Sequence, residues 1–212
     1  NTEGIGNTAI GRRAMKDNST GDYNTAVGFN ALYNNETANG NSALGYQALT
    51  YCTTGTGNTG MGYKALYTMT DDTNNTAFGY EALMTADGQG QNTAVGWNAG
   101  KAITSAGYNT LIGKDAGKLL NTGGENVAIG SGALDAATGA VYNTTIGTNS
   151  LGATTGNSNV AIGYNAGQSQ TAASNNIYIG VEAGKNVGTS SPNIYIGYQA
   201  GYTNTGSGNC VS

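Results

Sequence analysis

The side chains that could carry out chemistry are few and scattered in this sequence. It contains no histidine, so neither a Ser–His–Asp nor a Cys–His nucleophilic arrangement can be built from it. The acidic residues are isolated apart from Asp71 and Asp72, which lie in the turn-like segment TDDTN. A Ca²⁺ site there would need further oxygen ligands, and a solvated turn is the simpler interpretation. The sequence therefore predicts no enzyme, no cofactor and no metal site.

Charge and hydropathy narrow the class of protein further. The net charge is −4 and the eight lysines and arginines form no basic stripe, so we expect no nucleic-acid partner. No apolar run approaches the roughly 18–20 residues of a membrane span, so we expect no membrane segment here. Leu, Ile, Val and Phe make up only about 15% of the chain. An aperiodic sequence so poor in large apolar residues would struggle to form a core.

A repeat of 17 residues fills the chain, and a repetitive fold could be stable without the large apolar core that this composition lacks. Each copy begins with an asparagine that a glycine follows four residues later, and the step is 17 except for steps of 16 before Asn159 and Asn209. Twelve full copies begin at Asn7, Asn24, Asn41, Asn58, Asn75, Asn92, Asn109, Asn126, Asn143, Asn159, Asn176 and Asn193, and a truncated thirteenth begins at Asn209. Residues 1–212 are thus expected to form a single repeat domain, and we expect the chain to be a fragment of a longer protein.

Four positions of the repeat, numbered from its asparagine, hardly vary. Position 1 is Asn and position 5 is Gly in all twelve copies, position 4 is always apolar, and position 8 is Ala except at Ser150. Gly, Asn and Thr at this density disfavour a helix. Short strands that end at Gly or at Asn/Thr/Gly turns fit better. For the copy at 24–40 we expect strands at 24–28 and 29–33 and a return segment at 34–40.

This pattern predicts an all-β fold, a parallel β-solenoid with about 17 residues per rung. Rungs that rise by about 4.8 Å would stack identical residues into columns. The columns would include an asparagine ladder at position 1 and a glycine corner at position 5. Cys52 and Cys210 would lie about 45 Å apart, too far for a disulfide within one chain.

Positions 3 and 4 lie on opposite faces of the first strand, and both are apolar. We assign the larger side chains to the core and the smaller ones to contact with a second copy of the chain; a monomer with exposed alanines is the alternative. The predicted core residues are Ile10, Val27, Leu44, Met61, Phe78, Val95, Ile112, Ile129, Ile146, Ile162, Ile179 and Ile196. The predicted contact residues are Ala9, Ala26, Ala43, Ala77, Ala94, Ala128, Ala161, Tyr178 and Tyr195.

Three further columns bear on function. Position 6 is aromatic in seven copies, and a stacked ladder is expected there, or a sugar-stacking surface if the rings are exposed. These residues are Phe29, Tyr46, Tyr63, Tyr80, Trp97, Tyr164 and Tyr198. Position 2 is mostly Thr; we expect it to face the lumen, which leaves an ice-binding solenoid as a remote alternative. Position 9 changes from Leu or Met to Gly in several later copies, and Tyr178 and Tyr195 are expected to alter the contact surface there.

The strings NVAIG (126–130 and 159–163) and NTAVG followed by an Ala-Leu pair resemble the head repeats of trimeric autotransporter adhesins. Similar arrays occur in phage tail fibres and bacterial surface fibres with a C-terminal intramolecular chaperone. The resemblance covers essentially the whole chain. It implies a left-handed parallel β-roll, packed as a homotrimer through the position-3 residues.

Together these features predict a non-enzymatic extracellular fibre or adhesin segment, on a cell surface or a virion. Its expected partners are two further copies of itself and surface glycans or a host receptor. The alternative is a purely structural filament or virion subunit with no specific ligand.

Overall fold

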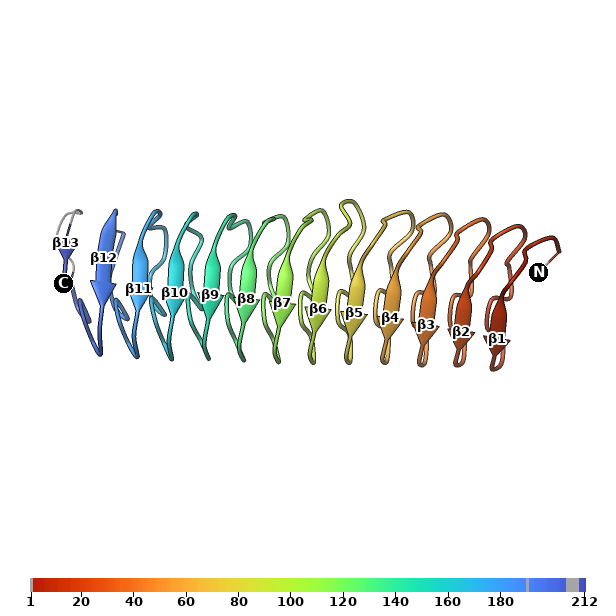
Figure 1. Ribbon diagram of the computed structural model, residues 1–212, viewed down its shortest axis with the longest axis horizontal. Helices are drawn as coiled ribbons and strands as arrows, with labels where there is room; N and C mark the ends of the chain where they lie inside the picture. The colour runs from red at the N-terminus through yellow and green to blue at the C-terminus, as the bar shows by residue number, and fades with distance from the viewer. Residues whose placement is uncertain (1, 190, 205–209) are drawn as a thin grey trace.

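The chain forms a rod of stacked rungs. The computed structural model describes residues 2–189, 191–204 and 210–212. One 13-stranded sheet runs along the rod with its strands in chain order, and the two ends of the chain lie at opposite ends of the rod (Figure 1). No helix occurs among the residues described. The prediction of an all-β parallel solenoid with about 17 residues per rung is confirmed.

Each rung contributes one short strand to this sheet. The strands are β1 Thr8–Ile10, β2 Thr25–Val27, β3 Ser42–Leu44, β4 Thr59–Met61, β5 Thr76–Phe78, β6 Thr93–Val95, β7 Thr110–Ile112, β8 Val127–Ile129, β9 Thr144–Ile146, β10 Val160–Ile162, β11 Ile177–Ile179, β12 Asn193–Ile196 and β13 Cys210–Val211. Neighbouring strands pair in parallel, so a given repeat position lies beside the same position of the next rung.

The 16-residue step before Asn159 leaves the sheet register intact. Thr144 still pairs with Val160, so the missing residue is absorbed outside the strands. At the last strand, Cys210 pairs with Asn193, which is a full 17-residue step. The predicted start of a thirteenth copy, Asn209, lies outside the described residues.

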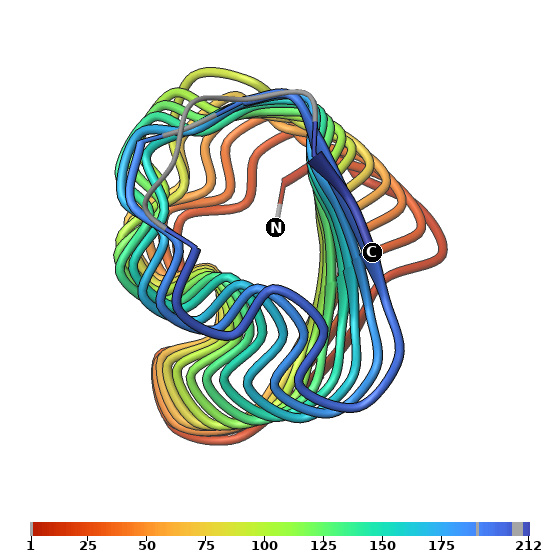
Figure 2. The same ribbon diagram turned by 90° about the vertical axis from the view of Figure 1, so that its left-hand side faces the viewer.

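The expected second strand at 29–33 is absent, and a series of turns takes its place. Positive φ angles at Asn30 (53°) and Leu32 (50°) alternate with ordinary ones, which no strand can accommodate. The turns still bond from rung to rung: the Leu32 N–H donates to the Ala48 carbonyl at 3.0 Å. Viewed along the rod, the rungs nearly superimpose, with a gradual rotation from one to the next (Figure 2).

The position-1 asparagines form a buried ladder along the rod. The Asn109 backbone N–H donates to Asn92 Oδ1 at 3.0 Å, and Asn109 Nδ2 donates to the Gly123 carbonyl at 3.1 Å. Backbone bonds of the first kind join each position-1 asparagine to the one before it, from Asn24 through Asn193. Each side chain thus provides hydrogen-bond partners for backbone groups inside the rod. A buried backbone group without a partner would lower the stability of the fold.

Position 5 is the corner at which each strand ends. All twelve of these glycines have φ between +127° and +141°, a region that other residues rarely adopt. At Gly79 an added Cβ would lie 2.3 Å from the carbonyl oxygen of Gly96 in the next rung. Both the backbone conformation and the close stacking of rungs therefore require glycine here.

The predicted assignment of the two strand faces is wrong. Position 3 faces the interior: the side chains of Ala26, Ala43, Ala77, Ala94, Ala128, Ala161, Tyr178 and Tyr195 are buried inside a single chain, and only Ala9, in the first rung, is exposed. Position 4, predicted to be the core, points outward. The physical reason is the period of two along a strand. Because position 1 is buried, position 3 shares its inward direction, and positions 2 and 4 face out.

In ten of the twelve rungs a large interior side chain at position 3 or position 9 is paired with a small one at the other position; the rungs of Ala94 and Ala161 are small at both. Seven of the twelve rungs pair a small residue at position 3 with Leu or Met at position 9, as in Ala128 and Leu134, both fully buried. Leu111 instead lies against Gly117, where an added Cβ would be 2.8 Å from Leu111 Cδ2. Tyr178 and Gly184 repeat this exchange. The change in the later copies is thus a rearrangement of the core, and Tyr178 and Tyr195 do not alter an outer contact surface as predicted.

Candidate binding surface

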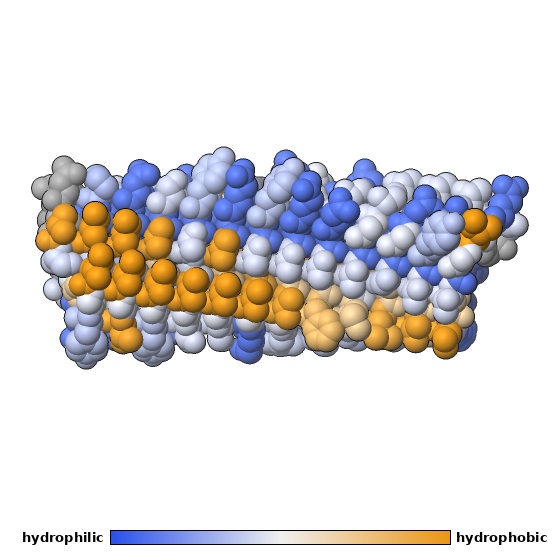
Figure 3. Space-filling model, in the orientation of Figure 1, coloured by the Kyte–Doolittle hydropathy of each residue, from blue (hydrophilic) through white to orange (hydrophobic). Residues whose placement is uncertain are grey.

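An apolar row runs along the outer face of the sheet, across all twelve rungs (Figure 3). This outer apolar row consists of the position-4 residues Ile10, Val27, Leu44, Met61, Phe78, Val95, Ile112, Ile129, Ile146, Ile162, Ile179 and Ile196. Seven of these side chains are exposed, from 37% at Ile112 to 59% at Ile10, and the other five are half-buried. Between Leu44, Phe78 and Tyr80 the row borders a shallow apolar hollow.

A second row, position 2, lies beside the outer apolar row and changes character along the rod. It is Thr or Ser from Thr8 to Thr110 and again at Thr144, but Val127, Val160, Ile177 and Ile194 make it apolar in the later rungs. These side chains are exposed or half-buried on the outside, so the prediction that the Thr row faces the lumen is wrong. The apolar surface is therefore two residues wide over much of the C-terminal half (Figure 3).

Five of the seven position-6 aromatic residues form one stacked ladder on the outside of the rod. The ring centroids of Phe29 and Tyr46 are 5.3 Å apart, as are those of Tyr46 and Tyr63, and those of Tyr63 and Tyr80 are 4.8 Å apart. The first four rings are parallel within 9°, while Trp97 is tilted by 33° against Tyr80. These rings cover one another's faces and leave mainly their edges in solvent.

A cation closes each end of this ladder. The Arg12 guanidinium lies 5.5 Å from the Phe29 ring centroid, and Lys114 Nζ lies 5.0 Å from that of Trp97. Arg12 and Lys114 occupy position 6 in the rungs just before and just after the ladder, so the repeat itself places them there. Both contacts have the geometry of cation–π interactions, worth about 0.5–1 kcal/mol each at exposed sites.

The other two aromatic residues at position 6, Tyr164 and Tyr198, stand apart from the ladder. They are 51% and 73% exposed, and Val181 occupies position 6 in the rung between them. Within the part of the chain that the structure describes, neither ring stacks on another ring or a cation. The structure thus separates the predicted column into a closed ladder and two open rings.

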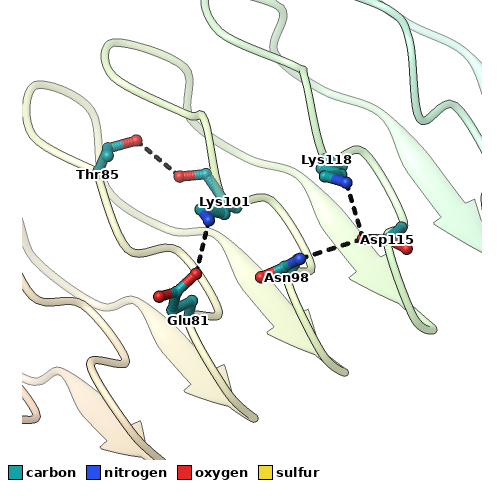
Figure 4. A network of polar contacts seen from close by, with 6 residues as sticks. All are labelled: Glu81, Thr85, Asn98, Lys101, Asp115 and Lys118. Carbon is teal, nitrogen blue, oxygen red and sulfur yellow. Dashed lines mark hydrogen bonds and ion pairs between the residues drawn. The ribbon is translucent and has the colours of Figure 1, made fainter.

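Polar side chains at positions 7 and 10 interact from rung to rung (Figure 4). Lys101 Nζ lies 2.6 Å from Glu81 Oε2, Asn98 Nδ2 donates to Asp115 Oδ1 at 3.3 Å, and Lys118 Nζ lies 3.4 Å from the same oxygen. Burial opposes ionisation of Asp115, but its lysine and asparagine partners outweigh that effect, and its pKa is lowered. Ion pairs that are still partly exposed, as these are, add little to stability.

Asp72 and Cys52, two residues considered for chemistry from the sequence, are both buried. Asp72 Oδ2 accepts the Gly88 N–H at 2.9 Å, and burial raises the pKa of this carboxyl. Cys52 is a free, buried thiol whose pKa burial raises to about 12. Among the described residues, no three His, Cys, Asp or Glu side chains are grouped as metal ligands would be. The described part of the chain also contains no helix of the length and hydrophobicity needed to span a membrane.

No protein-family model, curated protein or solved structure matches this chain. The functional argument therefore depends on the surface features themselves: the outer apolar row, the closed aromatic ladder and the two open tyrosines.

The outer apolar row was missed as a surface, although the sequence held the signal for it. The constant asparagine at position 1 is suited to an internal amide ladder, and the period of two then places position 4 outside. The prediction was instead based on side-chain size, which favours Ile and Leu over Ala as core residues. It therefore placed position 4 in the core and position 3 outside, the reverse of the observed arrangement. The isolation of Tyr164 and Tyr198, in contrast, can be read directly from Val181 between them.

Proposed function

We propose that this chain is a non-enzymatic segment of an extracellular fibre or adhesin, in which three copies pack into a rigid rod. The rod would hold a receptor-binding region away from its base and attach to glycans or a host receptor. The resemblance of the repeats to adhesin heads and tail-fibre arrays supports this assignment.

The outer apolar row is the observation on which the proposal depends. It is a continuous line of Ile, Val, Leu, Met and Phe side chains, bordered on the face shown in Figure 3 by mostly hydrophilic residues in the N-terminal half. Large contiguous apolar patches are rare on monomeric proteins and usually mark an interaction surface. Because the row has the periodicity of the rungs, the simplest cover is the same row on another copy of the chain.

The stoichiometry of three comes from the family resemblance, now with a different face at the interface. The position-3 residues, which are buried within one chain, cannot make the contact. We instead assign the contact between chains to the position-4 residues, together with the apolar position-2 residues of the C-terminal half. Complete burial of a large apolar side chain contributes about 1.5–3 kcal/mol, and these side chains are at most 59% exposed, so assembly would gain about half of that or less at each rung. Summed over twelve rungs, this gain favours a closed trimer.

Two other functions remain as candidates. A structural filament or virion subunit without a ligand would use the same trimer. Ice binding gains one observation, because the Thr row at position 2 faces solvent rather than the lumen. However, the neighbouring position-4 side chains vary from Val to Phe, so the face is not flat. Thermal hysteresis of a solution of the purified chain would detect an ice binder.

Light scattering of the purified chain tests the assembly. The proposal predicts a mass of about 64 kDa, three times the 21.3 kDa of one chain. A glycan array probed with the same preparation then separates adhesin from filament. Binding to a defined set of glycans supports the adhesin, and a clean negative favours the structural filament.

A further inference from the structure

We propose that Tyr164, Val181 and Tyr198 form a binding slot for one pyranose ring of a neutral glycan. This tyrosine slot rests on the proposed function and specifies it, because it gives the fibre a ligand class and a site. It lies on the position-6 column, in the three rungs that begin at Asn159, Asn176 and Asn193.

The closed ladder cannot provide such a site. Proteins bind sugars by stacking the C–H face of a pyranose on the face of an aromatic ring. In the ladder, the faces of Tyr46 and Tyr63 are covered by parallel rings 4.8–5.3 Å away. Its two ends are covered by Arg12 and Lys114. A sugar would have to displace these contacts before it could stack.

The two tyrosine rings are far enough apart to hold a sugar between them, because the rung that separates them has no aromatic residue at position 6. Adjacent stacked rings of the ladder are 4.8–5.3 Å apart, so rings two rungs apart would be about 10 Å apart. Non-bonded carbon atoms pack at about 3.5–4.0 Å, so two such contacts leave room for a single puckered six-membered ring. Val181, 44% exposed, would form the apolar floor between Tyr164 and Tyr198.

Polar groups suited to sugar hydroxyls lie beside the slot at position 7. Gln199 Nε2 donates to Glu182 Oε2 at 2.8 Å, and Lys185 Nζ donates to Glu182 Oε1 at 2.6 Å. Gln199 is exposed and Glu182 is half-buried, whereas the neighbouring Asn165 is buried at 4% exposure and is out of reach of a ligand. The site therefore offers the Glu182 carboxylate and the Gln199 amide as hydrogen-bonding groups for sugar hydroxyls.

The charge balance favours a neutral sugar over an acidic one. The hydrogen bonds from Gln199 and Lys185 lower the pKa of Glu182, so its carboxylate is ionised at neutral pH. Lys185 is already paired with that carboxylate and has no free anion-binding role. An acidic sugar would bring a second negative charge to Glu182 and meet repulsion.

Isothermal titration of the purified chain, in whatever assembly it adopts, tests the slot. The probes are cellotetraose, maltotetraose and N,N′,N″,N‴-tetraacetylchitotetraose, with 3′-sialyllactose as the acidic probe. We expect at least one neutral probe to saturate one site per chain. Tyr164→Ala and Tyr198→Ala should each weaken the affinity for that probe about tenfold or more, because each variant loses one aromatic contact with the sugar. The matched control is Tyr142→Ala, at a tyrosine outside position 6 whose exposure (57%) lies between those of Tyr164 (51%) and Tyr198 (73%), and this variant should bind as the wild type does.

Val181→Tyr is the decisive variant because it fills the slot without removing a ring. It would recreate the Tyr46–Tyr63–Tyr80 stack, so the melting temperature should hold or rise while glycan binding is lost. Absence of binding by every neutral probe, binding of sialyllactose alone, or wild-type affinity in Val181→Tyr would each overturn the proposal. A trimer that binds no probe contradicts the slot alone, whereas a monomer that binds contradicts the trimer alone.

Discussion

The ring of Tyr178 occupies the space that a side chain at Gly184 would need: an added Cβ there would lie 2.2 Å from Tyr178 Cδ1. Both residues lie in one rung, and the rung that contains Ala128 and Leu134 fills the same interior space with the sizes reversed. These two rungs thus fill the same interior space in alternative ways, and exchanging the large and small residues between positions 3 and 9 tests whether the two arrangements are equivalent.

Tyr178→Ala alone should lower the free energy of unfolding by about 3–5 kcal/mol, since it leaves a cavity in the core. Gly184→Leu alone should be comparably harmful through overpacking. The double variant should recover a large part of the loss, because Leu134 shows that Leu tolerates the positive φ of position 9 (56°). Thermal unfolding followed by circular dichroism gives the comparison. A double variant no more stable than the worse single variant contradicts the exchange.

A polar pair in another rung predicts a second coupled effect. Thr145 and Ser150 replace the usual residues at positions 3 and 8, and their buried hydroxyl groups hydrogen-bond to each other. Thr145→Ala or Ser150→Ala should each cost about 1 kcal/mol. The double variant restores the Ala–Ala pairing of other rungs and should be at least as stable as the wild type. Additive losses in a double-mutant cycle would show that the two hydroxyl groups act independently.

The asparagine ladder should be sensitive to a single interruption. Asn92→Ala removes the oxygen that accepts the Asn109 N–H and leaves that donor buried without a partner. The expected loss is about 1–3 kcal/mol for each orphaned group, together with faster hydrogen exchange at the Asn109 amide. Asn186→Ala, at an exposed asparagine outside the ladder, is the control and should change stability by less than about 0.5 kcal/mol. Equal effects of the two substitutions would contradict the ladder's role.

Asp72 should make stability depend on pH in the direction opposite to that of a paired carboxylate. Burial raises its pKa, so the folded chain favours the protonated form. The penalty for the buried carboxylate is absent below the unfolded-state pKa of about 3.9 and complete above the raised folded-state value. Asp72→Asn should therefore melt higher than the wild type at neutral pH, and the difference should vanish near pH 3. A difference that does not change with pH would contradict this explanation.

The repeat sequence predicts the backbone better than it predicts the direction of side chains. Position 5 must be glycine because Gly79 has both a positive φ and a carbonyl oxygen within 2.3 Å of its missing Cβ, and the constant Gly was a sufficient signal. The turns at Asn30 and Leu32 were mistaken for a strand, since neither residue type requires a positive φ. Only stacking between rungs forces that conformation.

The two strand faces could not be assigned from residue size. In a rung this narrow the lumen holds Ala at position 3, because the alanine of position 8 and the leucine of position 9 occupy the rest. Ala26, Ala31 and Leu32 fill one rung in this way, and all three are fully buried. The large position-4 residues then face out, where a monomer would leave them in water. The tyrosine slot depends on the same outward surface.

The most direct test of the account is the mass of variants that change only the outer apolar row. The wild-type chain should scatter as a species of about 64 kDa, and Ile129→Lys/Ile146→Lys should scatter as the 21.3 kDa monomer. Leu119→Lys/Val141→Lys adds the same charge at apolar residues outside the row and should remain trimeric. A wild-type monomer, or a trimer that survives lysines at Ile129 and Ile146, would contradict the claim that this row joins the chains.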